Sequence, residues 1–459
     1  MPYLQSSTLV LFNLVAFLVP VGLTLLAIGA APEERDKQVA ATALVALATA
    51  VIGYFACGFA FQFGGAAFVS GMPGLHSLTA EWSPLDLAWG PGWGVIGLRG
   101  FFLNAEAYNA DTYLLFASHL AAVTTAVLAT LLTLCHHIKR IYLLAIGLLV
   151  SSFVYPLFGN WVWGGGWLSN LGLNLGLGHG FVEVAGCGAI YLLGTLVALS
   201  VFLIVKPYHV AEGGPARLPP IHFPLLMVLG ALLAVVGWPG LVLGNPLIHE
   251  QVVTALVVVN LILAAAGGAL IASLYSWFVT GQPDALTIGR ATVAGLVAAS
   301  AACAFIPAWA ALLIGMMAGL LLLLGLYVWE RVLRLDDPSG MLATLGLPAI
   351  WGTLAVAIFA DGRWGVGWNG VGVQEYLGIP GQGISGLCLA GGYQPAGPVQ
   401  LHAQLVGLGA LLVVALLVPW LIFRTIAWLN AAGRRVYAGQ LKPSSDLSPA
   451  ETHQEDENA

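Results

Sequence analysis

Charged residues are scarce in this sequence. Lysine, arginine, aspartate and glutamate together make up 8% of the 459 residues, whereas soluble globular domains carry about 25%. Hydrophobic residues account for 59% of the chain, and the mean hydropathy is +0.91. This composition excludes an ordinary soluble domain and predicts an all-α polytopic protein of the lipid bilayer.

Cysteines and clustered basic residues are lacking as well. The five cysteines are far apart and form no CxxC or Cys/His spacing, so we predict small buried cysteines, no metal site and no cofactor. Lysine and arginine occur in ones and twos, which gives no indication of nucleic-acid binding. No nucleophile elbow or phosphate-binding loop occurs in a suitable context, so we predict no enzyme and no catalytic residue.

Long apolar runs take the place of these features. Runs of about 20 residues, enough for a helix to cross a bilayer, predict eleven transmembrane helices. The first lacks a basic segment before it and is long enough to span, so we predict a retained helix rather than a cleaved signal peptide. The predicted spans are 8–30, 38–62, 112–134, 141–159, 181–205, 221–243, 252–278, 289–306, 308–329, 340–360 and 401–428.

The distribution of basic residues predicts the orientation. When alternate loops are assigned to the cytoplasm, thirteen of the fifteen lysines and arginines lie inside and only Arg99 and Arg363 lie outside. Cytoplasmic loops carry an excess of basic residues. We therefore predict a multi-pass protein with its N-terminus outside and its C-terminus in the cytoplasm.

The segments between the spans differ in character. Residues 63–110 and 361–400 are rich in glycine, proline and tryptophan, which predicts ordered caps that form a vestibule over the bundle. Residues 436–459 are polar and acidic and predict a disordered cytoplasmic tail, which leaves residues 1–435 as the membrane domain.

Three stretches resemble the ammonium transporter/Rh family: "YPLFGNWVWGGGWL" at 155–168, "GQPDALTIGRATVAGLVAASAACAFIPAWAALLIGMMAG" at 281–319, and "DDPSGMLATLGLPAIWGTLAVAIFA" at 336–360. The likeness continues at 92–103 and 400–407 and covers nearly the whole membrane region. It implies a plasma-membrane homotrimer. Each subunit would have its own pore between two inverted five-helix repeats, with an eleventh helix across the outside, and would carry ammonium, ammonia or a related small solute.

The resemblance also implies an outer cation site. Trp163 matches the family tryptophan, whose indole face attracts a cation. An interfacial anchor is the alternative for this tryptophan, a role that suits Trp161 and Trp167 better. Glu183 stands where the family has an aspartate that braces the site through backbone hydrogen bonds, and Asn245 stands where it has a serine.

Deeper in the pore the sequence departs from the family. Tyr191 and Leu345 replace the two pore histidines, which can share a proton because imidazole both donates and accepts near neutral pH. Ala122 and Leu241 replace the two gate phenylalanines. Since Tyr191 and Leu345 cannot relay a proton in this way, we predict electroneutral passage.

Other polar residues could replace the missing pair. His119, three residues before Ala122, is the histidine that we expect to face the pore, with a packing role as the alternative. We expect a packing or interfacial role for His179, His249 and His402. His136 and His137 are expected in a solvated loop, and Asp336 and Asp337 are expected to cap a helix start.

Two functions remain open. The first is a transmembrane channel for ammonium, ammonia or a related solute. The second is a non-conducting ammonium sensor or partner subunit that keeps the family fold. The family's tail often contacts a PII-type regulator, but only "DLS" at 446–448 resembles its motif, so the sequence gives little support for such a partner.

Overall fold

Apolar segments in lipid become helices because a helix satisfies its own backbone N–H and C=O groups. The computed structural model describes residues 2–31, 36–84, 92–206, 222–396 and 398–440. The helices up to residue 205 are α1 (Pro2–Ala16), α2 (Leu18–Ala30), α3 (Asp36–Gly53), η1 (Tyr54–Gly58), α4 (Phe59–Phe63), α6 (Ala110–Leu134), α7 (Arg140–Leu149), η6 (Val150–Val154), α8 (Tyr155–Trp163), α9 (Leu171–Leu175), η7 (Cys187–Leu192) and α10 (Leu193–Val205).

The remaining long helices follow in the same manner, several of them interrupted by a π-helical turn. They are α11 (His222–Leu243), α12 (Pro246–His249), α13 (Thr254–Thr280), α14 (Ala285–Ala299), α15 (Ala308–Tyr327), η8 (Val328–Val332), η9 (Leu342–Gly346), α16 (Leu347–Phe359), α17 (Pro398–Leu411), η11 (Leu412–Leu417) and α18 (Val418–Gln440). Such π-helical turns, here η1, η6, η7, η8, η9 and η11, are frequent at functional sites.

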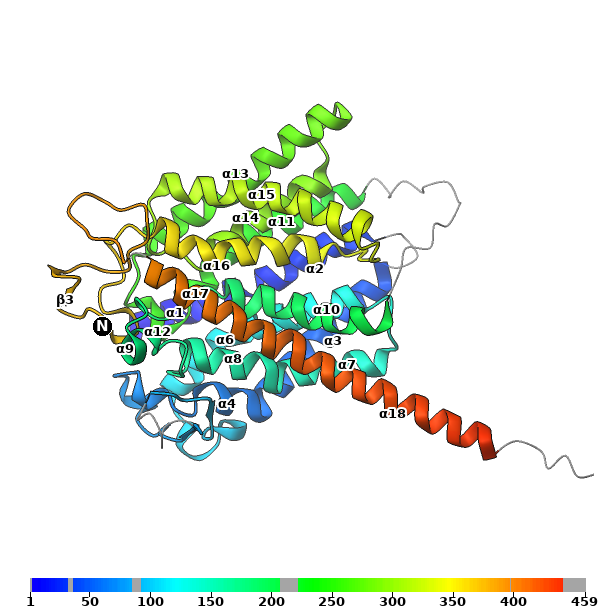
Figure 1. Cartoon of the computed structure of the whole chain (residues 1–459), viewed down its shortest axis with the longest axis horizontal. Coiled ribbons are helices and arrows are strands. Elements are labelled where there is room, and N and C mark those ends of the chain that lie inside the picture. Colours follow the sequence, from blue (N-terminus) through cyan, green and yellow to red (C-terminus); the bar gives the residue numbers. More distant parts are fainter. Residues whose placement is uncertain (1, 32–35, 85–91, 207–221, 397, 441–459) are drawn as a thin grey trace, which may run out of the picture.

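One end of the bundle is covered by irregular segments, and we call it the cap end. In Figure 1 it lies at the left, where β3, α9 and α12 are found, while α18 leaves the bundle at the opposite end. The cap contains short 3₁₀ helices and two antiparallel strand pairs, β1 with β2 and β3 with β4. Their bounds are η2 (Ala66–Phe68), η3 (Pro73–Leu75), β1 (Glu81–Trp82), β2 (Ile96–Gly97), η4 (Phe101–Leu103), η5 (Ala105–Ala107), η10 (Trp368–Gly370), β3 (Glu375–Tyr376) and β4 (Ile379–Pro380).

Within the described residues, ten helical segments are long and apolar enough to cross a membrane, and they correspond to ten of the eleven predicted spans. The span predicted at 289–306 is represented by α14, which ends at Ala299 and is followed by turns. Asn260 of α13 stabilises these turns, because its buried amide donates to the carbonyls of Cys303 and Ile306, each at 2.8 Å. Non-helical backbone at membrane depth is tolerated where the protein satisfies it in this way.

The span predicted at 181–205 also begins later than expected. Its helix starts at Cys187, so the prediction is wrong for residues 181–186, which are irregular and include Gly186 at φ +77°. Gln404 of α17 satisfies this backbone: it accepts from the Val182 N–H at 2.9 Å and donates to the Val182 carbonyl at 3.0 Å. Gln400, one turn earlier, makes the same pair of contacts with residues 179 and 180.

Small residues allow the helices to pack closely. α2 packs against α11, and α13 packs against α14 and α15. A Cβ at Gly22 would overlap the Gly230 carbonyl oxygen, and one at Gly315 would overlap the carbonyl oxygen of Ala264. Close backbone approach of this kind is typical of membrane helices, where lipid gives no hydrophobic driving force between them.

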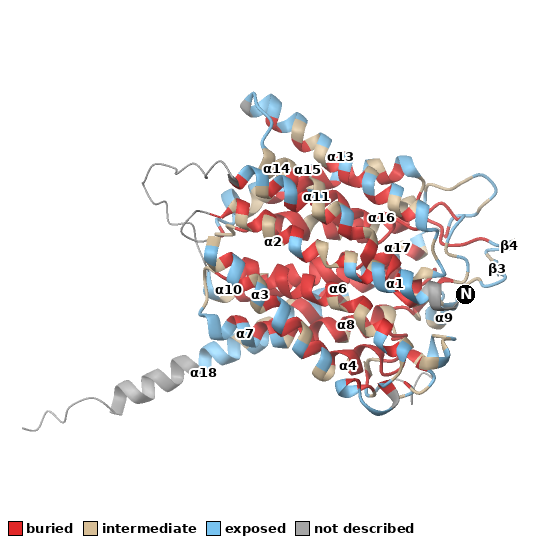
Figure 2. Ribbon diagram, turned by 180° about the vertical axis from the view of Figure 1, so that it is seen from behind, coloured by how far each residue is buried: buried red, intermediate tan, exposed pale blue. Residues whose placement is uncertain are grey.

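Burial differs sharply among the helices. Figure 2 shows α6 largely buried in the middle of the bundle and α18 largely exposed where it is described. α17, η11 and the start of α18 form one long apolar segment along the outside, and η11 and α18 contact α10. α18 continues to Gln440, and the rest of the predicted tail lies outside the described residues.

Candidate pore and outer site

A vestibule opens at the cap end, as the loop composition predicts. It is a cavity of about 800 Å³ whose lining comes from within segments 68–73, 162–173, 246–251 and 367–370. Trp163 is among the lining residues. Cap loops and the ends of α8 and α12 therefore form one hollow together.

Trp163 is held in a fixed orientation in this vestibule. It ends α8, and the chain turns immediately afterwards through Gly165, at φ +91°. The indole Nε1 donates to the Glu183 carbonyl oxygen at 3.0 Å. The bond fixes one edge of the ring and leaves the indole partly exposed beside the cavity, the arrangement that a cation–π site needs.

Glu183 is almost fully buried, at 1% exposure. Its Oε2 accepts from the Gly188 N–H at 2.9 Å, at the first turn of η7. A carboxylate placed there satisfies unpaired N–H groups and opposes the positive end of the helix dipole. The contact supports a bracing role for Glu183.

Glu183→Gln is therefore expected to lower the thermal unfolding midpoint together with any flux, because an amide opposes the helix dipole less strongly than a carboxylate. Thermal unfolding of the purified protein and flux into liposomes would be measured side by side. Glu375→Gln, which neutralises an exposed carboxylate of β3, is the matched control. A Glu183→Gln protein that keeps its midpoint but loses flux would instead indicate a direct electrostatic role.

His119 contacts both Asn245 and Trp163. The Asn245 Oδ1 accepts from the Leu247 N–H at 3.0 Å and so caps α12, while its Nδ2 lies 3.3 Å from His119 Nε2. The His119 ring packs edge-on against Trp163, with 5.3 Å between the ring centroids. Outer-site residues predicted from distant parts of the sequence thus come together in the structure.

The other ring nitrogen of His119 meets a second polar group of residues. Its Nδ1 lies 2.9 Å from the Tyr155 hydroxyl and 3.3 Å from the Gln62 Nε2. The Tyr54 hydroxyl donates to Gln62 Oε1 at 2.9 Å. All of these side chains are buried, so the histidine is hydrogen-bonded on both sides of its ring.

Tyr191 and Leu345 are both fully buried, on η7 and η9, and these two π-helical turns contact each other. The Tyr191 ring stacks on Trp238 at 4.9 Å between centroids. Its hydroxyl is buried beside the Ser300 hydroxyl, which accepts from the Trp238 indole N–H at 2.8 Å.

Ala122 and Leu241 are buried as well, at 5% and 6% exposure, on α6 and α11, which contact each other. Neither side chain is aromatic. On the same two helices, the ring of His119 lies one turn before Ala122, and the ring of Trp238 lies one turn before Leu241.

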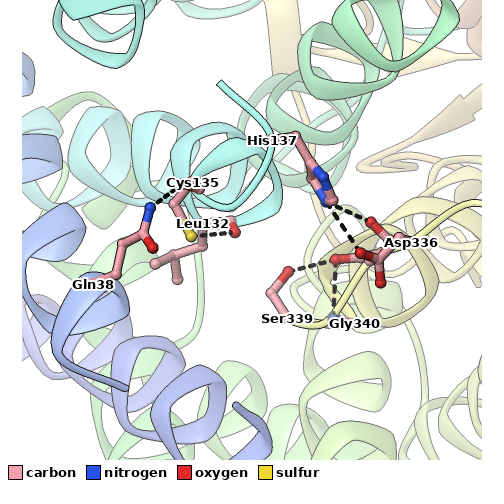
Figure 3. A network of polar contacts seen from close by, with 8 residues as sticks. Gln38, Leu132, Cys135, His137, Asp336, Ser339 and Gly340 are labelled. Carbon is pink, nitrogen blue, oxygen red and sulfur yellow. Dashed lines mark hydrogen bonds and ion pairs between the residues drawn. The ribbon is translucent and has the colours of Figure 1, made fainter. Parts of the chain in front are cut away.

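At the end opposite the cap, the predicted capping role of Asp337 is confirmed. Its Oδ2 accepts from the Leu342 N–H at 2.9 Å, at the start of η9. The expectation of a solvated loop is wrong for His137, whose Nε2 lies 2.8 Å from the Asp336 carbonyl oxygen and whose ring packs on Phe202. Figure 3 shows this contact beside Ser339 and Gly340.

Sequence reasoning missed several partners of the site. Tyr155 opens the quoted motif at 155–168, and Gln62 is the one amide in the apolar run at 54–63, so both carried a signal. Neither signal pointed to His119, because the contacts join residues 36 and 57 positions apart in the chain. Within the described residues, no group of three or more His, Cys, Asp or Glu is arranged to hold a metal ion.

The fold and its vestibule define a polytopic membrane protein with a polar site between helices. A model described as Ammonium Transporter Family matches residues 7–433. Ammonium transporter Amt2 of Archaeoglobus fulgidus is 31% identical over 350 residues, covering 75% of this chain and 69% of that protein. The chain belongs to the ammonium transporter family.

Other relatives agree. A putative ammonium transporter of Synechocystis sp. is 31% identical over 276 residues, covering 59% of this chain and 60% of that protein. Among solved structures, one titled Sensor Amt Protein has a TM-score of 0.72 at 23% identity, covering 93% of this chain and 94% of that one. Saccharomyces cerevisiae Mep2 has a TM-score of 0.69 at 19% identity, covering 92% and 84%. At these identities the structures show a shared fold.

Proposed function

We propose that this chain is a channel that lets an ammonium-derived solute cross the membrane as a neutral species, ammonia. The observation that carries this proposal is the pair of fully buried side chains at the family's histidine positions, Tyr191 and Leu345. Leucine cannot carry a proton. A bare ion is expensive in such surroundings, so the neutral form is favoured.

The outer site supports the same proposal. Trp163 offers an indole face at the vestibule, where ammonium in solution would first bind. Asn245 and His119 follow it inward, and the buried Tyr191 hydroxyl offers a further hydrogen-bonding group deeper in the bundle. The vestibule therefore suits binding of the ammonium cation, and the mostly apolar path beyond it suits passage of ammonia after its proton has been left outside.

Three structural features belong to this proposal. α14 and the turns that follow it form the eighth of eleven crossings, which make up two inverted five-helix repeats and an outer eleventh helix, with the N-terminus outside. Residues 1–435 are the membrane domain and 436–459 the cytoplasmic tail. The chain assembles as a homotrimer in the plasma membrane. The charge asymmetry of the loops and the family membership support these features.

A non-conducting sensor is the second candidate, and one observation favours it. The structure titled Sensor Amt Protein shares the fold over 93% of this chain. In a sensor, the outer site would bind ammonium without any passage of solute. Binding of a PII-type regulator is not part of either proposal.

Flux distinguishes the two candidates. When ammonium is added outside liposomes that contain the purified protein, ammonia entering the lumen takes up a proton, so the internal pH should rise faster than in protein-free liposomes. A trapped pH-sensitive dye gives the rate. Ammonium binding with an unchanged internal pH rate would favour the sensor.

A further inference from the structure

Residues that come together beneath the vestibule point to a gate specific to this chain. Trp163 lines the cavity, and so do Pro246 and Leu247, which directly follow Asn245. Both Trp163 and Asn245 contact His119, which is 3% exposed. The imidazole therefore lies directly behind two parts of the vestibule wall.

On α6, His119 comes before Ala122, the position that lies deeper in the bundle. Ala122 lies one turn further along α6, and no residue of α6 after His119 carries a ring. The Phe63 ring packs edge-on against the imidazole at 4.9 Å between centroids. The side chain that stands between the vestibule and the deep path on this helix is thus His119.

The contact with Asn245 fixes the tautomer of His119. The Asn245 amide cannot turn over, because its oxygen accepts the Leu247 N–H that caps α12. Its nitrogen, which can only donate, therefore faces His119 Nε2 at 3.3 Å. Nε2 must be the acceptor, and the imidazole proton resides on Nδ1.

Of the two partners of Nδ1, the Tyr155 hydroxyl agrees with this tautomer as it is placed. The Tyr155 hydroxyl, 2.9 Å away, can accept from the Nδ1–H. The Gln62 amide nitrogen lies 3.3 Å from Nδ1 and would oppose this proton, so the tautomer requires the Gln62 oxygen and nitrogen to be exchanged, with the Tyr54 hydroxyl then accepting instead of donating. A proton on Nε2 would instead oppose the donor of Asn245, so the ring is held as the neutral imidazole.

We propose that His119 is the gate of this pore, and that its Nε2 lone pair exchanges the Asn245 amide for an N–H group of the solute. The proposal rests on the proposed function and requires that the solute carry an N–H donor at the gate. Opening breaks one hydrogen bond, between α6 and the turn that joins α11 to α12. His119 accepts a hydrogen bond and takes no proton, which agrees with electrically silent passage.

The gate is tested by removing the Asn245 donor. Asn245→Ser keeps a residue type that caps helices well, but its short side chain does not reach His119. Ammonia flux into liposomes should rise about two- to tenfold, the factor that corresponds to one ordinary hydrogen bond. In a His119→Leu background the acceptor is gone, so the same Asn245→Ser change should have no effect.

Two further variants serve as controls for this experiment. His119→Gln keeps an acceptor oxygen and should keep flux within about twofold of native, the lower end of the range for one ordinary hydrogen bond. His402→Leu removes an exposed histidine of α17 and should leave flux unchanged. Size-exclusion profiles of all variants show whether each is folded.

The outcomes separate the gate from the transport proposal. A native protein that conducts, with flux unchanged in both Asn245→Ser and His119→Leu, would overturn the gate and leave transport standing. If neither the native protein nor Asn245→Ser shows any ammonia flux, both the gate and the transport proposal are overturned. An increase in Asn245→Ser that disappears in the His119→Leu background supports the gate.

Discussion

The double substitution Tyr191→His with Leu345→His is expected to produce an ammonium-evoked current that the native protein lacks. The two positions lie on η7 and η9, which contact each other deep in the bundle. Imidazoles there would place a donor and an acceptor in the middle of the path, and paired imidazoles can pass a proton. Charge transport should then rise from the background of protein-free liposomes to a saturable current.

The single substitutions are the controls for this experiment. Tyr191→His alone and Leu345→His alone each supply one imidazole without its partner, so neither should give a current. A current from one single variant as large as that from the double variant would show that the pair is not what carries charge. A folded double variant that gives no ammonium-evoked current would contradict the assignment of Tyr191 and Leu345 to the family's histidine positions.

Trp163→Leu is expected to weaken ammonium or methylammonium binding several-fold, since a partly desolvated cation–π contact contributes about 1 kcal/mol or more. The indole is the aromatic face at the vestibule that is oriented by a hydrogen bond, to the Glu183 carbonyl. Binding to the purified protein would be measured by isothermal titration calorimetry. Flux at low substrate concentration should fall by a similar factor.

Trp167→Leu is the matched control, because Trp167 follows in the same loop, is partly buried and packs against Trp161 at 5.4 Å between ring centroids. It should leave binding unchanged. Equal binding by native protein and Trp163→Leu would make Trp163 a packing residue.

The sequence predicts most of the fold because hydropathy is enough to locate a membrane helix. It fails where tertiary hydrogen bonds replace those of a helix. The irregular backbone at residues 181–186 is apolar enough to resemble a helix, and its partner Gln404 lies more than two hundred positions away. α14 stops at Ala299 for a similar reason, with Asn260 satisfying the turns that follow.

The site could be predicted only position by position. Family resemblance selects Trp163, Asn245 and Tyr191 from their motifs, and the spacing on α6 makes His119 a candidate. What the sequence could not predict is that the Asn245 amide contacts His119, since the two are 126 positions apart. The tautomer of His119 follows from that contact and from the α12 cap, and neither is encoded in a local pattern.

Electrical silence during ammonia passage is tested most directly by recording current and internal pH from the same liposomes containing the native protein. Addition of ammonium outside should raise the internal pH faster than in protein-free liposomes. The current should stay at the level of the protein-free control, because Tyr191 and Leu345 leave no imidazole pair to carry the proton. A saturable, ammonium-dependent current from the unmodified protein, comparable with that of the Tyr191→His, Leu345→His variant, would contradict neutral passage.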